Sequence, residues 1–172
     1  MLKLHFIDDQ YPQAEITHIR KIARAIVLDE NNNIIILQIK RNDIFGNYSY
    51  LETPGGGVEE NETISHAVKR ELEEEIGTKV KIIKKIGIVG DYYNLLNRQN
   101  ENHYFLVKVV SKTKIHHESF GDSFISNILN IPLDEVIKIY EEENNIDIIK
   151  LVKQRELPIL LEAKRIITNL IK

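Results

Sequence analysis

The sequence predicts an α+β fold in which a mixed β-sheet lies between helices. Up to Ile131 the sequence contains several short runs of β-branched and apolar residues, each bounded by turn residues, which is typical of strands. One longer segment between these runs, and others after them, have apolar residues at the spacing of a helix. With 172 residues, of which 42% are hydrophobic and 28% charged, the chain is long enough for one such domain with an apolar core and short for two.

Six strands are expected from β-branched runs, at 21–28, 34–40, 48–53, 79–89, 102–110 and 125–131. The first two form a hairpin across the turn 29–33, because Asp and Asn favour turn conformations. Residues 90–94 are expected to connect two later strands, and residues 111–122 are polar without a clear pattern.

Three helices are expected. The first has Thr63 as its N-cap and Gly77 as its C-cap. The second, 133–142, follows Pro132 and carries acidic residues in its first turn. The last, 157–171, is amphipathic, and its inward positions are Leu160, Leu161, Ala163, Ile166, Ile167 and Leu170.

The N-terminal residues 1–20 begin with alternating apolar positions at 2, 4 and 6. This pattern predicts either an edge strand or an arm that packs on a second copy in a homodimer. No repeat, low-complexity segment or linker interrupts the sequence, so residues 1–172 are expected to form a single domain.

Composition excludes several classes of function. The formal net charge is -3, which does not favour binding to nucleic acid or to an acidic membrane. The absence of cysteine removes disulfides, thiolate metal sites and cysteine nucleophiles. No apolar run of membrane-spanning length occurs, and the first residues include acids where a signal peptide would be apolar. A cytoplasmic protein is expected.

The first helix carries an unusual density of carboxylates. Val68, Leu72 and Ile76 form its apolar stripe, while Glu71, Glu74 and Glu75 converge on an adjacent arc and Glu73 points away. Like charges at this spacing cost roughly 0.2–0.5 kcal/mol per pair in an isolated helix. Two interpretations remain open at this point: a solvated acidic face, or a site for a divalent cation.

The spacing of residues from the glycine loop to the end of this helix resembles the signature of the Nudix hydrolases, the family of MutT-like proteins. The residues that carry the resemblance are Gly56, Glu62, Arg70, Glu71, Leu72, Glu74, Glu75 and Gly77. Thr78 departs from the pattern, which usually has a bulky aliphatic residue at this packing position. The resemblance implies an α/β/α sandwich.

The resemblance also implies a reaction, the cleavage of a pyrophosphate bond in a nucleoside diphosphate linked to another group, with Mg²⁺ or Mn²⁺. The implied metal ligands are the carbonyl of Gly55 and the carboxylates of Glu71, Glu74 and Glu75. Arg70 would orient the glutamates, and Glu62 would support the loop and the helix start. The general base would be Glu71 or a glutamate on a later loop, for which Glu118 is the candidate.

Candidate substrate-binding residues are Gly56 and Gly57 in the glycine loop, Arg41 at a strand end, and the pair Tyr92 and Tyr93. Arg41 could contact phosphate or only solvate the strand end, and the tyrosines could stack on a base or only pack.

The expected substrate is a small-molecule nucleotide: a nucleotide sugar, a dinucleoside polyphosphate or a nucleoside triphosphate. No proline occurs between Pro54 and Pro132, which counts against an ADP-ribose hydrolase. The acidic balance counts against an RNA-decapping enzyme. A non-catalytic nucleotide sensor on the same fold is the alternative function.

Overall fold

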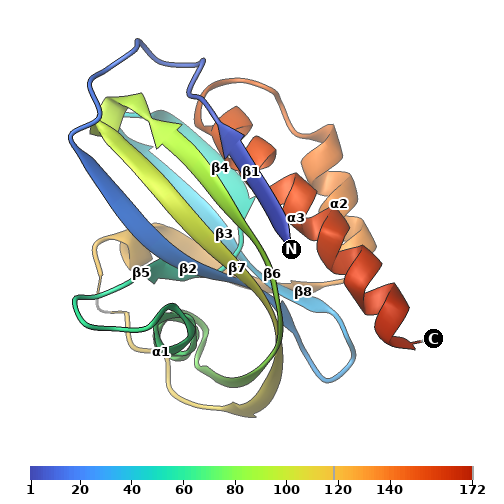
Figure 1. Ribbon diagram of the computed structural model, residues 1–172. Coiled ribbons are helices and arrows are strands. Elements are labelled where there is room, and N and C mark those ends of the chain that lie inside the picture. The colour runs from blue at the N-terminus through green and yellow to red at the C-terminus, as the bar shows by residue number, and fades with distance from the viewer. Residues whose placement is uncertain (118, 172) are drawn as a thin grey trace.

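The computed structural model describes residues 1–117 and 119–171, which form a mixed sheet of eight strands with helices on both faces (Figure 1). Helix α1 (Ile64–Ile76) covers one face, and helices α2 (Leu133–Glu142) and α3 (Asp147–Ile171) lie on the other. The predicted mixed sheet between helices is therefore confirmed.

The strands are β1 (Leu2–Phe6), β2 (His18–Leu28), β3 (Ile34–Asp43), β4 (Gly46–Glu52), β5 (Gly55–Gly57), β6 (Thr78–Tyr93), β7 (Arg98–Lys112) and β8 (Ile125–Ile131). Short 3₁₀ helices, η1 (Asn94–Leu96) and η2 (Gly121–Phe124), precede β7 and β8. The order across the sheet is β1-β6-β7-β2-β3-β4, with β5 paired to β2 and β8 paired to β3. The β1–β6 and β2–β7 pairs are parallel, and the others are antiparallel.

The sheet divides along β2. Strand β3 pairs with β2 only beside their hairpin, through Val27 with Ile35 and Leu28 with Ile34. Nearer its start, β2 pairs instead with the glycine strand β5. The β3–β4 half of the sheet therefore diverges from the β2–β7 half, and the glycines lie where the two halves separate.

Several boundaries differ from those predicted. Residues 90–93 continue β6 rather than forming a connection, because β1 and β7 both pair with the backbone there. Helix α3 begins at Asp147, whereas the sequence predicted a start at Leu157. The earlier turns are helical because they bury an apolar face against the core, and Pro158 inside the helix removes only one backbone donor.

Residues 2–6 form an edge strand, which is one of the two predicted alternatives. Leu2, Leu4 and Phe6 pack against the core, while the residues between them face outward. None of the helices in the described ranges is both long and apolar enough to cross a membrane.

Helix α3 is attached to the sheet by a buried ionic network as well as by apolar packing. Arg155 is fully buried and contacts Glu52 Oε1 at 2.6 Å, Glu156 Oε1 at 2.9 Å and Asp91 Oδ2 at 3.4 Å. Its Nη1 also donates to the hydroxyl of Tyr93 at 2.7 Å. A buried cation with this many partners is stable only while all of them remain in place.

Replacing Arg155 by Met is expected to destabilise the protein by about 3–5 kcal/mol, because it leaves buried carboxylates without their counter-ion. Arg165→Met on the same helix is the matched control, since Arg165 is exposed and, among the described residues, pairs with Glu162 alone. That control should cost less than about 1 kcal/mol. Urea unfolding measures both changes, and equal effects would contradict a structural role for the network.

Candidate functional site

The glycine strand β5 allows helix α1 to approach the sheet backbone. Gly55 has φ 138°, which favours glycine, and a Cβ atom there would lie 2.1 Å from the carbonyl oxygen of Ala23. A Cβ atom at Gly56 would lie 2.4 Å from Oε2 of Glu71. Only glycine therefore lets the Glu71 carboxylate lie directly against the chain at this point.

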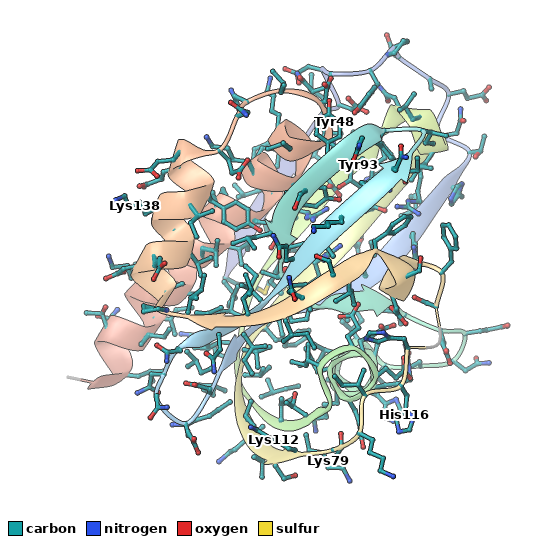
Figure 2. All side chains as sticks on the ribbon, turned by 180° about the vertical axis from the view of Figure 1, so that it is seen from behind. Tyr48, Lys79, Tyr93, Lys112, His116 and Lys138 are labelled. Carbon is teal, nitrogen blue, oxygen red and sulfur yellow. The ribbon has the colours of Figure 1, made fainter. Side chains whose placement is uncertain are left out.

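Helix α1 forms as its sequence predicts. The Thr63 side chain accepts a hydrogen bond from the backbone N–H of His66, and Gly77 ends the helix in the left-handed conformation. Near its C-terminus, the Gly77 N–H donates to the carbonyls of Leu72 and Glu73, and the backbone carbonyl of Glu74 accepts from the N–H of His116 at 2.9 Å. Figure 2 shows His116 beside this helix. The helix is thus held at both ends.

Arg70 organises the carboxylates at the start of the site. Its Nε and Nη2 each bind one oxygen of Glu62 at 3.0 Å, and Nη2 also donates to the carbonyl of Gly57 at 2.9 Å. Its Nη1 donates to Glu71 at 2.9 Å and to Glu74 at 3.1 Å. The hydrogen bonds from Arg70 lower the pKa of Glu62 to about 2. Arg70 therefore ties the loop, the helix and two signature glutamates together.

Glu71 and Glu75 are buried carboxylates. Burial raises the pKa of Glu71, although Arg70 opposes the effect. Burial raises the pKa of Glu75 well above its usual range, and the hydrogen bond that Gly55 N donates to Oε2 at 2.7 Å offsets only part of it. Two desolvated acids side by side on one helix favour a cation between them.

A cavity of about 620 Å³ lies in front of these acids, between the two halves of the sheet. The predicted residues that line it are Arg41, Gly55, Gly56, Gly57, Glu71, Glu75 and Tyr93. Its volume falls in the range of small-molecule sites. The structure thus brings the glycine loop, two signature glutamates and two of the predicted substrate-binding residues to one cavity.

Not all of the expected ligands are assembled. Glu74 is turned to Arg70 and does not line the cavity, and the described residues contain no group of three acids or histidines arranged to hold one ion. Glu73 lies outside the site, 3.9 Å from Lys79, as the angular analysis predicts. For three glutamates to hold one cation, the Glu74 carboxylate would have to leave Arg70 and turn toward Glu71 and Glu75.

Of the two tyrosines proposed either to stack on a base or only to pack, Tyr93 lines the cavity and Tyr92 does not. Successive residues of a strand point to opposite faces, so Tyr93 enters the cavity while Tyr92 packs edge-on against His5 of β1, with ring centroids 5.0 Å apart. Arg41 binds Asp43 and the hydroxyl of Tyr50. Glu118, the candidate second base, lies outside the described residues.

Other cavity residues were not predicted. Asp122 is buried and accepts hydrogen bonds from the backbone and hydroxyl of Ser119, and its charge raises the pKa of Glu71 and Glu75. Arg20 and Arg98 also line the cavity. The sequence contains a signal for Arg20. Arg20, Ile22 and Arg24 are each two residues apart, so in a strand they point to the same face and place two cations there, which favours an anion-binding surface.

Glu75→Gln is expected to stabilise the metal-free protein near neutral pH. Folding raises the pKa of the Glu75 carboxyl, so this group lowers the free energy of unfolding at any pH above its pKa in the unfolded chain. The loss grows by roughly 1.4 kcal/mol per pH unit until the pH passes the pKa of the group in the folded protein. Urea unfolding with a chelator, from about pH 4 to about pH 8, should show an advantage of the variant that grows with pH. The control is Glu73→Gln outside the cavity, and an advantage that is flat with pH would refute the prediction.

Comparisons with known proteins agree with this geometry. Residues 18–152 match the family model described as the NUDIX domain. An 8-oxo-dGTP diphosphatase from Proteus vulgaris is 42% identical over 59 residues, which are 34% of this chain and 51% of that protein. The chain thus spans about half the length of this curated relative.

Two solved structures share the fold at low sequence identity. A NUDIX hydrolase from Nitrosomonas europaea superposes with TM-score 0.62 at 18% identity, covering 86% of this chain and 89% of that one. The MutT protein from Methanosarcina mazei Go1 superposes with TM-score 0.61 at 16% identity, covering 90% and 97%. With a family model that matches most of its length and a fold shared with MutT-like proteins, the chain belongs to the NUDIX family.

Proposed function

We propose that this protein is a metal-dependent pyrophosphohydrolase that cleaves the diphosphate bond of a nucleotide or of a nucleoside diphosphate linked to another group. The observation that carries the proposal is the pair Glu71 and Glu75, buried against the glycine backbone and open to a cavity of ligand size. Membership of the NUDIX family supports the same reaction class.

The donor set suits Mg²⁺, or Mn²⁺ in its place. Hard divalent cations prefer oxygen ligands, and the chain offers the carboxylates of Glu71 and Glu75 and the carbonyl of Gly55, with no cysteine. Burial raises the pKa of both acids, and a bound cation would offset the cost of ionising them in this setting. Glu74 is the proposed third carboxylate ligand, after it releases Arg70.

When bound, the cation neutralises phosphoryl charge and activates water for attack. The chain's own residues have separate tasks. Arg70 holds Glu71 through Oε1 and so orients it, while burial raises the pKa of the Glu71 carboxylate and suits it to accept a proton from the attacking water. Gly56 and Gly57 let a phosphoryl group approach the backbone without a side chain between them.

The other end of the cavity is suited to a nucleoside. Tyr93 and Phe45 line it and pack against each other, with ring centroids 5.7 Å apart. Arg41 lies over the rings of Phe45 and Phe124, at 4.6 and 5.1 Å from their centroids. Such planar groups stack on nucleobases without strong preference for one base. The diphosphatase relative named above acts on a nucleoside triphosphate, which is one of the proposed substrates.

A non-catalytic sensor remains the second candidate, and one observation favours it: Glu74 and Glu71 both bind Arg70 rather than converging on an ion position. Turnover decides between the two. A sensor binds nucleotide and releases no phosphate.

Glu71→Gln and Glu75→Gln are each expected to lower kcat by about 100-fold or more, because each removes a charged ligand from the reacting centre. A panel of nucleoside diphosphate derivatives with Mg²⁺, scored for phosphate after phosphatase coupling, measures the loss. Glu73→Gln is the matched control and should retain activity, since Glu73 lies outside the cavity.

Titration with Mg²⁺ or Mn²⁺ should show binding that Glu71→Gln weakens, and an unchanged isotherm would refute the ligand assignment.

If the wild-type protein binds nucleotides but releases no phosphate from any substrate of the panel, the protein is a nucleotide sensor and the proposed hydrolase function is wrong.

A further inference from the structure

Two arginines of the cavity have no carboxylate partner among the described residues. Of the seven arginines in the sequence, the other five each bind a carboxylate: Arg24, Arg41, Arg70, Arg155 and Arg165. Arg20 and Arg98 make no such contact, although both line the cavity. Glu71 attracts Arg20 and Asp91 attracts Arg98 through space, but neither guanidinium is held in an ion pair with a described carboxylate. Both can therefore contact a ligand.

The strand register brings the two guanidinium groups to one end of the cavity. Strands β2 and β7 run parallel, with His18 opposite Arg98 and Arg20 opposite Asn100. Residues opposite each other, and residues two apart, point to the same face of the sheet. Arg20, Arg98 and Asn100 therefore face the same side at the start of both strands.

Unsatisfied donors accompany this charge. Within the described part of the chain, the buried Nε of Arg98 and the amide nitrogen of Asn100 have no acceptor. Asn100 is fully buried and does not line the cavity, and its amide oxygen also lacks a partner, so Arg98 Nε is the donor that bears on a ligand. Partial burial and the nearby Arg20 lower the pKa of Arg98, which indicates that the two cations repel each other. Buried donors are normally satisfied, so this cluster points to an anion.

The cluster adjoins the proposed catalytic centre. A Cβ atom at Gly57 would lie 2.7 Å from Nη2 of Arg20, and the neighbouring Gly56 contacts the Glu71 carboxylate. On the other side, the Arg98 guanidinium lies 5.8 Å from the ring centroid of Tyr93. Going away from Glu71, the cavity therefore presents Arg20, then Arg98, then an aromatic ring.

We propose that Arg20 and Arg98 bind a phosphoryl group of the substrate beyond the two that the cleaved bond joins. The inference rests on the proposed function and narrows its substrate class. Substrates with an additional phosphate neutralise both guanidinium groups, whereas a nucleoside diphosphate sugar leaves them unpaired. The additional phosphate comes from a longer linear chain, as in a nucleoside triphosphate or dinucleoside polyphosphate, or from a phosphomonoester on the ribose.

Binding is tested first, in chelator and without turnover. Titration with inorganic tripolyphosphate is expected to show binding that Arg98→Gln and Arg20→Gln each weaken by about tenfold, as loss of a charge-assisted contact does. The matched control is Arg165→Gln, which removes an exposed arginine elsewhere and should leave the isotherm unchanged. Equal binding in all four proteins would overturn the proposal, even if the enzyme proves active.

Turnover is tested second, with a nucleoside triphosphate, a nucleoside diphosphate carrying a ribose phosphate, and a nucleoside diphosphate sugar. Arg98→Gln should lower kcat/KM for one of the first two by about tenfold and leave the sugar substrate unchanged. If kcat/KM falls for the triphosphate alone, the arginines bind a phosphate of the linear chain. If it falls for the ribose-phosphate substrate alone, they bind the phosphomonoester. Equal loss on all three substrates would overturn the proposal.

Failure of the proposed function can be told apart from failure of this inference. In the first case the wild-type protein turns over no substrate, while the tripolyphosphate titration still shows whether the two arginines bind phosphate.

Urea unfolding completes the test. Arg98→Gln should not destabilise the metal-free protein, since it removes a cation that has no carboxylate partner and lies near another cation.

Discussion

The candidate site depends on the close approach of helix α1 to the backbone of β5. At Gly55 and Gly56 no side chain separates them, so the carboxylates of Glu71 and Glu75 lie against main-chain atoms and are taken out of water. The same approach lets Arg70 reach the carbonyl of Gly57 while it holds the signature glutamates. A side chain at either glycine would separate the helix from the strand and expose the acids.

The division of the sheet gives this contact its cavity. Strand β2 exchanges its partner from β3 to the short glycine strand, so one half of the sheet carries the glycines and Tyr93 of β6, and the other carries Arg41 and Tyr50. Glu52 binds both Arg24, with which it lines the cavity, and the fully buried Arg155, so the charges of these two cations are paired. Of the cavity carboxylates on helix α1, Glu71 binds Arg70, while the Glu75 carboxylate accepts only the backbone N–H of Gly55 among its described contacts. Arg20 and Arg98 contact no carboxylate among the described residues. A cation beside the carboxylates, followed by a chain of phosphates along the arginines, matches this arrangement.

Local signals in the sequence were reliable for helix α1 and less so for α3, where Leu161 and Leu170 were predicted to face inward but are exposed. Thr63 and Gly77 bound helix α1 as predicted, because capping depends on hydrogen bonds within a few residues. The apolar stripe of Val68, Leu72 and Ile76 is buried, as its helical spacing requires. The start of α3 was misplaced because Pro158 suggests an N-terminus, whereas packing on the sheet extends the helix to Asp147.

The order and spacing of residues along the chain were sufficient to recognise the NUDIX family and the mixed sheet between helices, since these follow from periodicity and short-range chemistry. They did not show that Glu74 turns away from Glu71 and Glu75 toward Arg70. They could not place Tyr92 outside the cavity or bring Arg20 and Arg98 to one face across β2 and β7. Those contacts depend on strand register and on which backbone neighbours a distant residue meets. Register arises from many weak pairings between remote segments, and no single stretch of sequence contains it.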